Sequence, residues 1–568
     1  MLGGCATVGS VRSAQALAHK AAVQSREALA AAHAATEQRQ VADQTLRAQL
    51  AKLRGRQQEL LERVDQLLAR SAQALAHQKT SQSRALGAAV KAEANAVFAQ
   101  AMSQAKVLAA QPYQAPPPIS PVLQKLSFSD YNKLGFVGRV PGWPAATPFH
   151  IQLHPAGYLF TWPEKIAIVA GGKTLPAQLP WTVTGDPGLA KRISGPVPTA
   201  GFSVYTPFSK GPAVNEFLSF LGASYFRAVG QGQSWGLSAR GVAVDTALPH
   251  RAEEFPYFQA FWIVAPHPHA RHLAFCALLD SPSLTGAYRF VVHPGRQTTI
   301  DVNAVLFERQ HVRRLGIAPL TSMFLQGRFS HRRFDHLVRS AHDSDGLSIV
   351  MPGNNRLWWP LRNPRRIAIY RFALTNPQGF GLVQRARRAG DYRAFGMHYE
   401  DRPSAWVTPE GNWGSGHLVL IELPTDSQTN DNISVFWVPN NQGALLQPLT
   451  FHYRIAWQGQ NPAGTQWGYV VGGRHAYNAQ SHNETYVVDF AGPVLASLAP
   501  AQVATHVHVL GPARVVNAWV ARDAAGNWRL QFDLARTGPG VVTIHAALMK
   551  GPAKVTETWA GVLPALHS

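Results

Sequence analysis

The residues of this chain that could carry out chemistry are aspartates in turn-forming sequences. Asp343 and Asp345 lie in HDSDG, Asp426 and Asp431 lie in PTDSQTNDNI, and Asp245 lies in ARGVAVDTALP. Hydrolysis of a glycosidic bond uses one carboxylic acid that protonates the leaving oxygen and a second carboxylate that activates water. Considered singly, each aspartate is more often a turn residue than a catalyst. A carboxylate pair for sugar chemistry is therefore one interpretation, and structural turns are the other.

Metal and phosphate chemistry are not expected. The sequence has no G-x-x-x-x-G-K-[ST] phosphate loop. The pairs His267-x-His269 and His506-x-His508 lack third and fourth ligands at a useful spacing. We therefore expect neither a metal ion nor a cofactor.

The chain of 568 residues is strongly basic, with a net charge of +21 and a pI near 10.3. Its basic residues are scattered, as in Arg313–Arg314 and Arg365–Arg366, and no zinc-finger, helix-turn-helix or RNA-recognition signature accompanies them. A nucleic-acid partner is therefore not expected. The charge instead favours solubility or attraction to anionic polymers of a cell envelope.

The sequence of residues 1–110 predicts a helical arm. The region from 11 to 108 is rich in Ala, Gln and Arg and contains no proline. An apolar heptad seam, with the polar Gln57 at one core position, predicts a coiled coil. Because one isolated helix cannot bury such a seam, it requires a second helix, from the Ala-rich flanks or from another subunit. The seam consists of Leu46, Leu50, Leu53, Leu60, Val64 and Leu67.

The rest of the chain predicts a mainly β protein. Residues 111–122, which include QPYQAPPP, read as a stiff extended linker. Short β-branched runs between turn residues predict a large antiparallel β-sandwich over 123–458. About seven further short strands over 459–568 predict an immunoglobulin-like domain. No run of eighteen apolar residues occurs, so no membrane-spanning helix is expected.

The β-rich part resembles a known family over its whole length, from about Leu123 to the C-terminus. The family is that of the periplasmic glucan biosynthesis proteins of Gram-negative bacteria, the G/D type that makes osmoregulated periplasmic glucans. The fold of that family, a large β-sandwich followed by a small immunoglobulin-like domain, agrees with the strand pattern. The matching stretches are HDSDG, PTDSQTNDNI, Leu221–Pro249, Ala277–Tyr288, Leu315–Phe324, Asn376–Arg385 and Arg402–Gly416.

The resemblance gives the aspartates roles. Asp431 matches the general acid of the family's TNDNI motif, and Asp343 matches the general base of its HDS motif, which acts on the nucleophilic water through intervening waters. The chain departs from the family at Arg356, where an acid is usual, and at Arg339-Ser340-Ala341. The expected substrate-binding residues are Tyr225, Trp235, Arg240, Asp245, His342, Asp345, Trp358 and Trp359.

The resemblance also implies a function. The first hypothesis is a periplasmic protein of osmoregulated glucan synthesis that binds the β-1,2-glucan backbone and cleaves it as an inverting endo-β-1,2-glucanase. The alternative is a catalytically silent β-glucan carrier or scaffold. The expected partners are the β-glucan, an inner-membrane glucan synthase and, through the arm, a second copy of the chain.

The two cysteines differ in their surroundings. Cys276 lies in the apolar run LAFCALLD and is expected to be a buried thiol. Cys5 ends Leu2-Gly3-Gly4-Cys5, which resembles the lipobox of bacterial lipoproteins, although no basic and apolar segment precedes it. Lipid anchoring through Cys5 in the periplasm is thus one expectation, and a chance match is the other.

Overall fold

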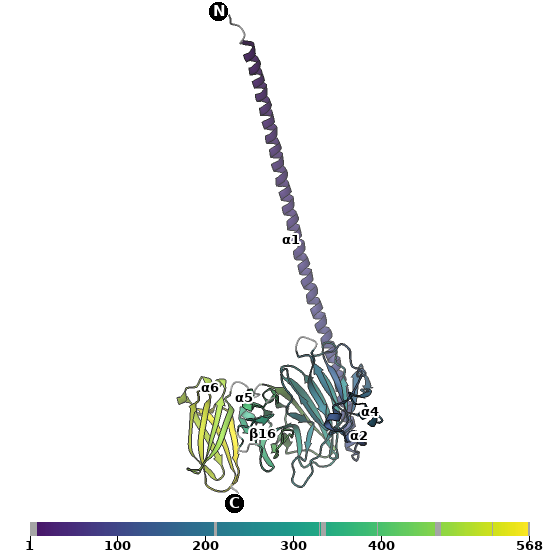
Figure 1. The fold of residues 1–568 in the computed structure, drawn as a ribbon, viewed down its shortest axis with the longest axis vertical. Helices are drawn as coiled ribbons and strands as arrows, with labels where there is room; N and C mark the ends of the chain where they lie inside the picture. Colours follow the sequence, from purple (N-terminus) through teal and green to yellow (C-terminus); the bar gives the residue numbers. More distant parts are fainter. Residues whose placement is uncertain are drawn as a thin grey trace, which may run out of the picture. The chain divides into compact units, whose positions relative to one another are not determined.

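The computed structural model describes residues 8–208, 213–328, 330, 337–394, 396–459, 467–524 and 526–565. The protein is mainly β, with the long N-terminal helix α1 (Val8–Ala109) preceding the strands (Figure 1), as the sequence predicts. Its contacts divide the chain into two units, Met1–Ala85 and Leu86–Ser568. None of the helices in the described ranges is long and apolar enough to cross a membrane.

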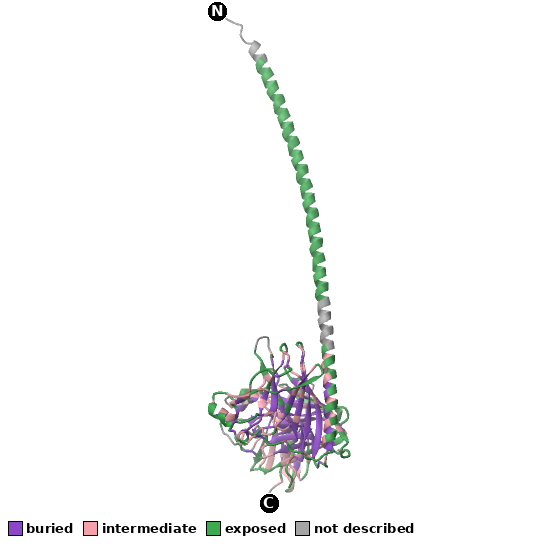
Figure 2. Cartoon of the chain, turned by 90° about the vertical axis from the view of Figure 1, so that its right-hand side faces the viewer, coloured by how far each residue is buried: buried purple, intermediate pink, exposed green. Residues whose placement is uncertain are grey.

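The described part of the first unit is helical, and its described side chains are exposed (Figure 2). The six residues of the predicted seam are 47% to 64% exposed. The described part of α1 continues through Gly55, where an added Cβ would meet nothing within 4 Å. The pairing of the seam with a second helix therefore stays a prediction.

The end of α1, from Leu86 to Ala109, belongs to the second unit and packs on its sheet. Ala101, Ala105 and Ala109 are buried, because small side chains let the helix backbone approach the sheet closely. The hydroxyl of Thr285 donates to the carbonyl of Ala105 at 2.7 Å, and Arg309 Nη2 donates to that of Leu108 at 2.9 Å. The division after Ala85 thus differs from the boundary expected at residue 110, because these alanines belong to the β-rich unit.

Two large sheets build that unit and face each other across one core. Phe220 of the first sheet meets Phe275 and Phe290 of the second edge-on, with ring centroids 5.2 Å apart in both pairs. The first sheet runs β2 (His150–Pro155), β6 (Thr199–Thr206), β7 (Asn215–Leu221), β8 (Tyr225–Ala228), β9 (Ser238–Arg240), β15 (Leu315–Ser322), β24 (Ile433–Pro439), β23 (Ser415–Glu422) and β20 (Ala368–Thr375), with β10 (Val242–Val244) beside β15.

The second sheet continues from the large part into the C-terminal part. Strand β33 pairs in parallel with β19, so that Trp358 lies opposite Trp559. Its order is β28 (Ala504–Leu510), β31 (Val542–Lys550), β33 (Thr558–Leu563), β19 (Arg356–Pro360), β18 (Gly346–Val350), β21 (Gly379–Val383), β22 (Ser404–Glu410), β25 (Pro448–Gln458), β14 (Thr298–Glu308), β13 (Leu284–His293), β12 (Leu273–Asp280), β11 (Tyr257–Val264), β3 (Lys165–Ala170) and β4 (Lys173–Pro176), with β32 (Ala553–Lys554) beside β31.

The C-terminal strands enclose a second core. A separate sheet runs β26 (Tyr469–Asn478), β27 (Asn483–Ala491), β30 (Trp528–Arg536) and β29 (Ala513–Arg522), and its residues share a hydrophobic cluster with β31 and β33. The buried ion pair between Arg385 and Glu557 joins this part to the large one at 2.5 Å. The immunoglobulin-like topology of this region stays a prediction.

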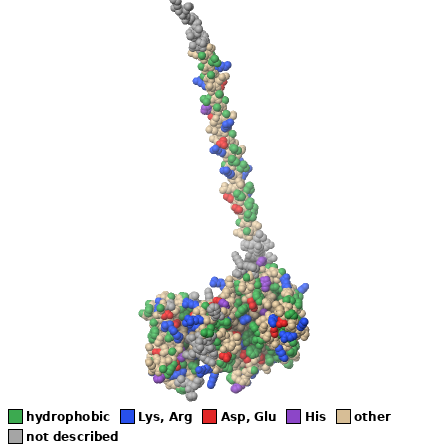
Figure 3. All heavy atoms as spheres, viewed as in Figure 1, with side chains coloured by type: hydrophobic (Ala, Val, Ile, Leu, Met, Phe, Trp, Pro, Cys, Tyr) green, Lys and Arg blue, Asp and Glu red, His purple; other side chains and the backbone are tan. Residues whose placement is uncertain are grey.

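Lys and Arg side chains are scattered over the face in view in Figure 3 rather than gathered in one patch, which fits the charge pattern of the sequence.

Short helices and strands complete the fold. The short elements are α2 (Pro121–Gln124), α3 (Phe128–Tyr131), β1 (Leu134–Phe136), β5 (Trp181–Val183), α4 (Pro187–Arg192), β16 (Phe324–Gln326), β17 (Ala341–His342), η1 (Pro352–Asn354), α5 (Ala389–Tyr392), η2 (Tyr399–Asp401), α6 (Pro493–Ala496) and η3 (Pro500–Gln502).

Candidate functional site

Two adjacent residues, Met323 just after β15 and Phe324 at the start of β16, hold the two segments that carry the candidate catalytic carboxylates. The carbonyl of Met323 accepts a hydrogen bond from the backbone N–H of Asp343 at 2.9 Å. The backbone of Phe324 pairs with the Asn432 side chain, which accepts from its N–H at 2.8 Å and donates to its carbonyl at 3.1 Å. Since Asn432 directly follows Asp431, one short stretch of chain positions both aspartates.

Asp343 is a buried carboxylate with a cationic partner. It is 4% exposed, and Arg402 Nη1 donates to its Oδ1. Burial raises the pKa of Asp343 to about 6, while the charge and hydrogen bond of Arg402 oppose this rise. The negative charge of nearby Asp431 acts in the same direction as burial and contributes to this raised pKa. A carboxyl with such a pKa can exchange protons near neutral pH.

Asp431 lies in the loop before β24, and its residue surface is accessible to solvent. Protein atoms still surround the carboxyl closely enough that desolvation raises its pKa, against the lowering effect of Arg240 and the Thr321 hydroxyl. That hydroxyl donates to Asp431 Oδ2 at 3.4 Å. An accessible carboxyl with a raised pKa is suited to donate a proton to a substrate.

Arginines and aromatic rings surround the pair. Arg227 interacts electrostatically with both aspartates, and its guanidinium lies 4.8 Å from the ring centroid of Trp235. Arg240 lies over the ring of Tyr225 at 4.5 Å and forms an ion pair with Glu253 at 2.7 Å. Tyr225, Trp235 and Arg240 therefore belong to the group of side chains around the carboxylates.

A cleft of about 650 Å³ adjoins this group, since Tyr225 and Arg227 line it. Trp162 and Phe255 are 37% and 50% exposed, so their rings are open to a ligand. Rings of this kind stack on sugars, and the basic and hydroxyl groups between them can bind sugar hydroxyls. The lining residues are Tyr113, Leu159, Phe160, Trp162, Ser219, Leu221, Gly222, Ala223, Tyr225, Phe226, Arg227, Ser238, Glu254, Phe255 and Pro282.

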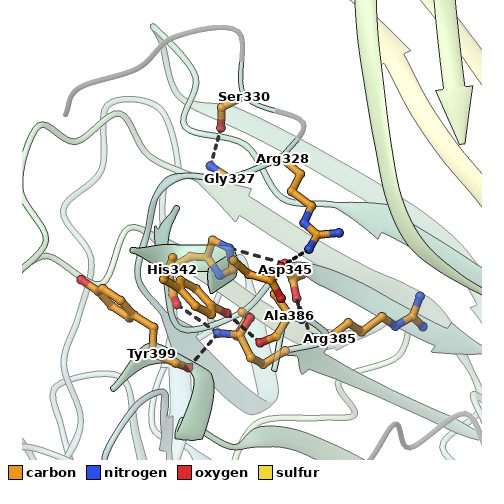
Figure 4. A network of polar contacts seen from close by, with 12 residues as sticks. Gly327, Arg328, Ser330, His342, Asp345, Arg385, Ala386 and Tyr399 are labelled. Atoms are coloured by element: carbon orange, nitrogen blue, oxygen red, sulfur yellow. Dashed lines mark hydrogen bonds and ion pairs between the residues drawn. The ribbon is translucent and has the colours of Figure 1, made fainter. Parts of the chain in front are cut away.

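His342 and Asp345 belong to the framework of the HDSDG turn. Asp345 Oδ2 accepts hydrogen bonds from the backbone N–H groups of Arg385 and Ala386, at 2.5 and 2.8 Å (Figure 4). The His342 ring is buried, lies 3.4 Å from Asp345 Oδ1 and stacks on Phe324. Burial lowers the pKa of His342. These contacts fix the turn that carries Asp343.

Three of the expected binding residues, Trp358, Trp359 and Asp245, do not line the cleft. Trp358 is 2% exposed in the C-terminal core, and Trp359 is 5% exposed in the core of the large part. Asp245 is 2% exposed and has a φ of 56°, and its carboxylate accepts from the backbone N–H of Arg314 at 2.9 Å. The structure does not bring these three side chains to the cleft. At Arg356, the neighbouring charge is that of Glu557 in the C-terminal part.

Sequence reasoning missed several residues of the site. Trp162, Phe255 and Tyr113 come from loops or the linker. Arg227 and Arg402 lie in stretches that match the family, but nothing in those stretches singled them out as site residues. The one sequence feature that points to Tyr113 is its place in the linker, just after the end of the predicted helix.

Two further groups of residues do not form a functional site. Gly232–Gly236 reads G-x-S-x-G, but Ser234 lies in the loop between β8 and β9, not at the strand-to-helix turn that a serine nucleophile requires. Within the described ranges, His398, Glu400 and Asp401 have ligand atoms within 4.8 Å of one another. His398 and Asp401 are exposed, which is common without a bound ion.

Comparison with known proteins gives one consistent result. Residues 97–562 match the model of the family described as "Periplasmic glucan biosynthesis protein, MdoG". The chain is 37% identical over 500 residues to "Glucans biosynthesis protein G" of Ralstonia nicotianae, covering 84% of this chain and 99% of the relative. The protein of that name in Pseudomonas aeruginosa is 39% identical over 482 residues, covering 82% and 92%. The one in Pectobacterium atrosepticum is 37% identical over 516 residues, covering 86% and 98%.

Proposed function

The chain belongs to the family of periplasmic glucan biosynthesis proteins, and on this premise we propose that it binds a β-1,2-glucan in the 650 Å³ cleft and cleaves it as an inverting endo-β-1,2-glucanase. The observation that carries this proposal is the pairing of Asp343 and Asp431, two carboxyls with raised pKa values beside an aromatic cleft. Arg227 connects them, because it lines the cleft and interacts with both.

In the proposed mechanism the two carboxyls have different tasks. Asp431, accessible and protonated, donates its proton to the glycosidic oxygen as the bond to the anomeric carbon breaks. A water molecule attacks that carbon from the opposite face, which inverts its configuration. Asp343, kept ionised by Arg402, receives the proton of this water through intervening waters. The buried position of Asp343 is the reason for a relay rather than direct contact.

The test is incubation of the purified protein with linear β-1,2-glucan, followed by analysis of chain length. Shortened oligosaccharides are expected. If the protein binds the glucan without shortening it, the alternative of a silent carrier or scaffold replaces the enzyme.

The pH dependence of cleavage follows from the two pKa values. Asp343 must be ionised to act as the base, so kcat/KM should rise with pH through about 6. Asp431 must be protonated to act as the acid, so kcat/KM should fall at higher pH. Because Arg402 lowers the pKa of Asp343, the Arg402→Gln variant should shift the acidic limb upward by roughly one unit.

This prediction is checked by pH–rate profiles of the wild type, Arg402→Gln and a control, Arg514→Gln, which removes an exposed arginine of the C-terminal part. The control should keep the wild-type profile. An acidic limb that stays in place in Arg402→Gln would refute the assignment of Asp343 as the base.

We also propose that the arm pairs with a second copy of the chain. A hairpin within α1 is not available, because the seam lies in one continuous helix, and its leucines are exposed. Burying such a seam requires an equivalent helix, and Gln57 at a core position favours a low oligomer with fixed register.

Light scattering measures this association. The intact protein should be a dimer or small oligomer, and a chain lacking residues 1–85 should be a folded monomer that still binds glucan, since Leu86–Ala109 stay packed on the sheet. A Leu50→Asp, Leu60→Asp variant provides the matched control, with the arm intact and the seam disrupted. A monomeric intact protein would contradict the proposal.

The last part of the proposal concerns where the protein is located in the cell. The protein is periplasmic, as its family is. We propose acylation of Cys5, which lies outside the described residues, as its anchor. An anchored protein would meet the nascent glucan near the inner-membrane synthase, its proposed partner.

A further inference from the structure

A second cleft, of about 970 Å³, borders the Pro-rich linker and has no task in the mechanism above. Its walls combine the rings of Trp181, Tyr257 and Trp262 with the polar side chains of Gln259 and Thr199. Trp181 and Trp262 are partly exposed. The mixture of accessible rings and polar groups, among them Lys165 and Glu164, resembles the lining of the first cleft and suits a hydroxyl-rich ligand.

The carboxyl of Glu164 lines this cleft. Glu164 is 5% exposed, and its Oε2 has no hydrogen-bond partner among the described residues. Its backbone, in contrast, is fixed by two hydrogen bonds with Thr199, at 2.8 and 2.5 Å. Burial raises the pKa of Glu164. The carboxyl can form a hydrogen bond with a ligand hydroxyl. A buried polar group without a partner costs stability, which a bound ligand would offset.

The two clefts are neighbours. Trp162, which lines the first, stacks on Tyr257, which lines the second, with ring centroids 5.0 Å apart. Two chain segments also pass from one cleft to the other. Tyr113 lines the first and Gln114 the second, and Trp162 is followed by Pro163 and Glu164. The ring of Trp162 therefore lies at the border between the two clefts.

We propose that the second cleft is a distal binding site for the same glucan chain. Trp181 stacks on a sugar ring there, and the carboxyl of Glu164 hydrogen-bonds a sugar hydroxyl. Only a chain long enough to extend beyond the first cleft reaches these groups, so the site gives the protein a preference for long glucans. This inference rests on the proposed function of the first cleft.

The test compares the affinities of a β-1,2-linked trisaccharide and of the long polymer, measured by calorimetry. The Trp181→Ala and Glu164→Met variants should each bind the polymer about tenfold more weakly, the loss expected for one stacking or hydrogen-bond contact. Both should bind the trisaccharide like the wild type. Trp181→Phe should keep most of the polymer affinity. Trp519→Ala, which removes a 41% exposed tryptophan of β29, is the matched control and should change neither affinity.

Glu164→Met keeps the test informative if Trp181→Ala does not fold. Methionine replaces the buried carboxyl without leaving a large cavity. If both variants bind the polymer like the wild type, or if both lose trisaccharide binding equally, the distal site is refuted. If the wild type itself binds neither glucan, the proposed function fails, and the inference fails with it.

Discussion

Replacing Asp431 with asparagine is expected to lower the kcat for cleavage of linear β-1,2-glucan by roughly 10²- to 10⁴-fold or more. The amide cannot donate a proton to the departing oxygen, whereas its size and hydrogen-bonding capacity leave the loop intact. Glucan binding should therefore remain close to that of the wild type. Initial rates and calorimetric affinities of the purified variant measure both effects.

Two controls make the result specific for proton donation. Asp426→Asn changes an exposed aspartate of the same loop and should keep wild-type activity. A glycoside with an activated aryl leaving group needs no proton, so Asp431→Asn should still cleave it. Cleavage of the unactivated polymer at the wild-type rate by Asp431→Asn would show that another residue is the acid.

Replacing Asp343 with asparagine should lower kcat about as much as the Asp431 variant does, roughly 10²- to 10⁴-fold, because the attacking water would lack its base. Some activity can persist, since the proposed water relay allows the proton to escape to solvent. Added azide, a small anionic nucleophile, should restore part of the turnover in Asp343→Asn and none in Asp431→Asn. Thermal unfolding of the variant serves as the check on folding, because Asp343 pairs with Arg402 in the interior.

The opposite pattern, rescue of Asp431→Asn by azide with no rescue of Asp343→Asn, would mean that the two roles are exchanged. Full activity of Asp343→Asn would remove it from the mechanism.

The long helix, the mainly β fold and the family could be predicted from the sequence, because each leaves a local pattern. The heptad spacing of α1 and the alternating strand runs depend on near neighbours in the chain. The two motifs with Asp343 and Asp431 are also local. Their joint anchoring by Met323 and Phe324 is not, since it joins segments of chain far apart in sequence.

The two adjacent tryptophans illustrate what the sequence could not decide. Successive residues of a strand point to opposite faces of its sheet, so Trp358 and Trp359 cannot share one sugar-binding wall. In β19 both faces are covered, one by the C-terminal core and the other by the core of the large part. Which aromatic residues line a cleft instead depends on loops such as that of Trp162, and loops carry no periodic signal.

The central claim is inverting cleavage by this pair of carboxyls, and the most direct test is NMR of the reducing ends while the wild type digests linear β-1,2-glucan. The newly formed ends should appear first as the α-anomer, before mutarotation, and should not appear with Asp431→Asn. First appearance of the β-anomer, or new ends at the wild-type rate with Asp431→Asn, would contradict the account.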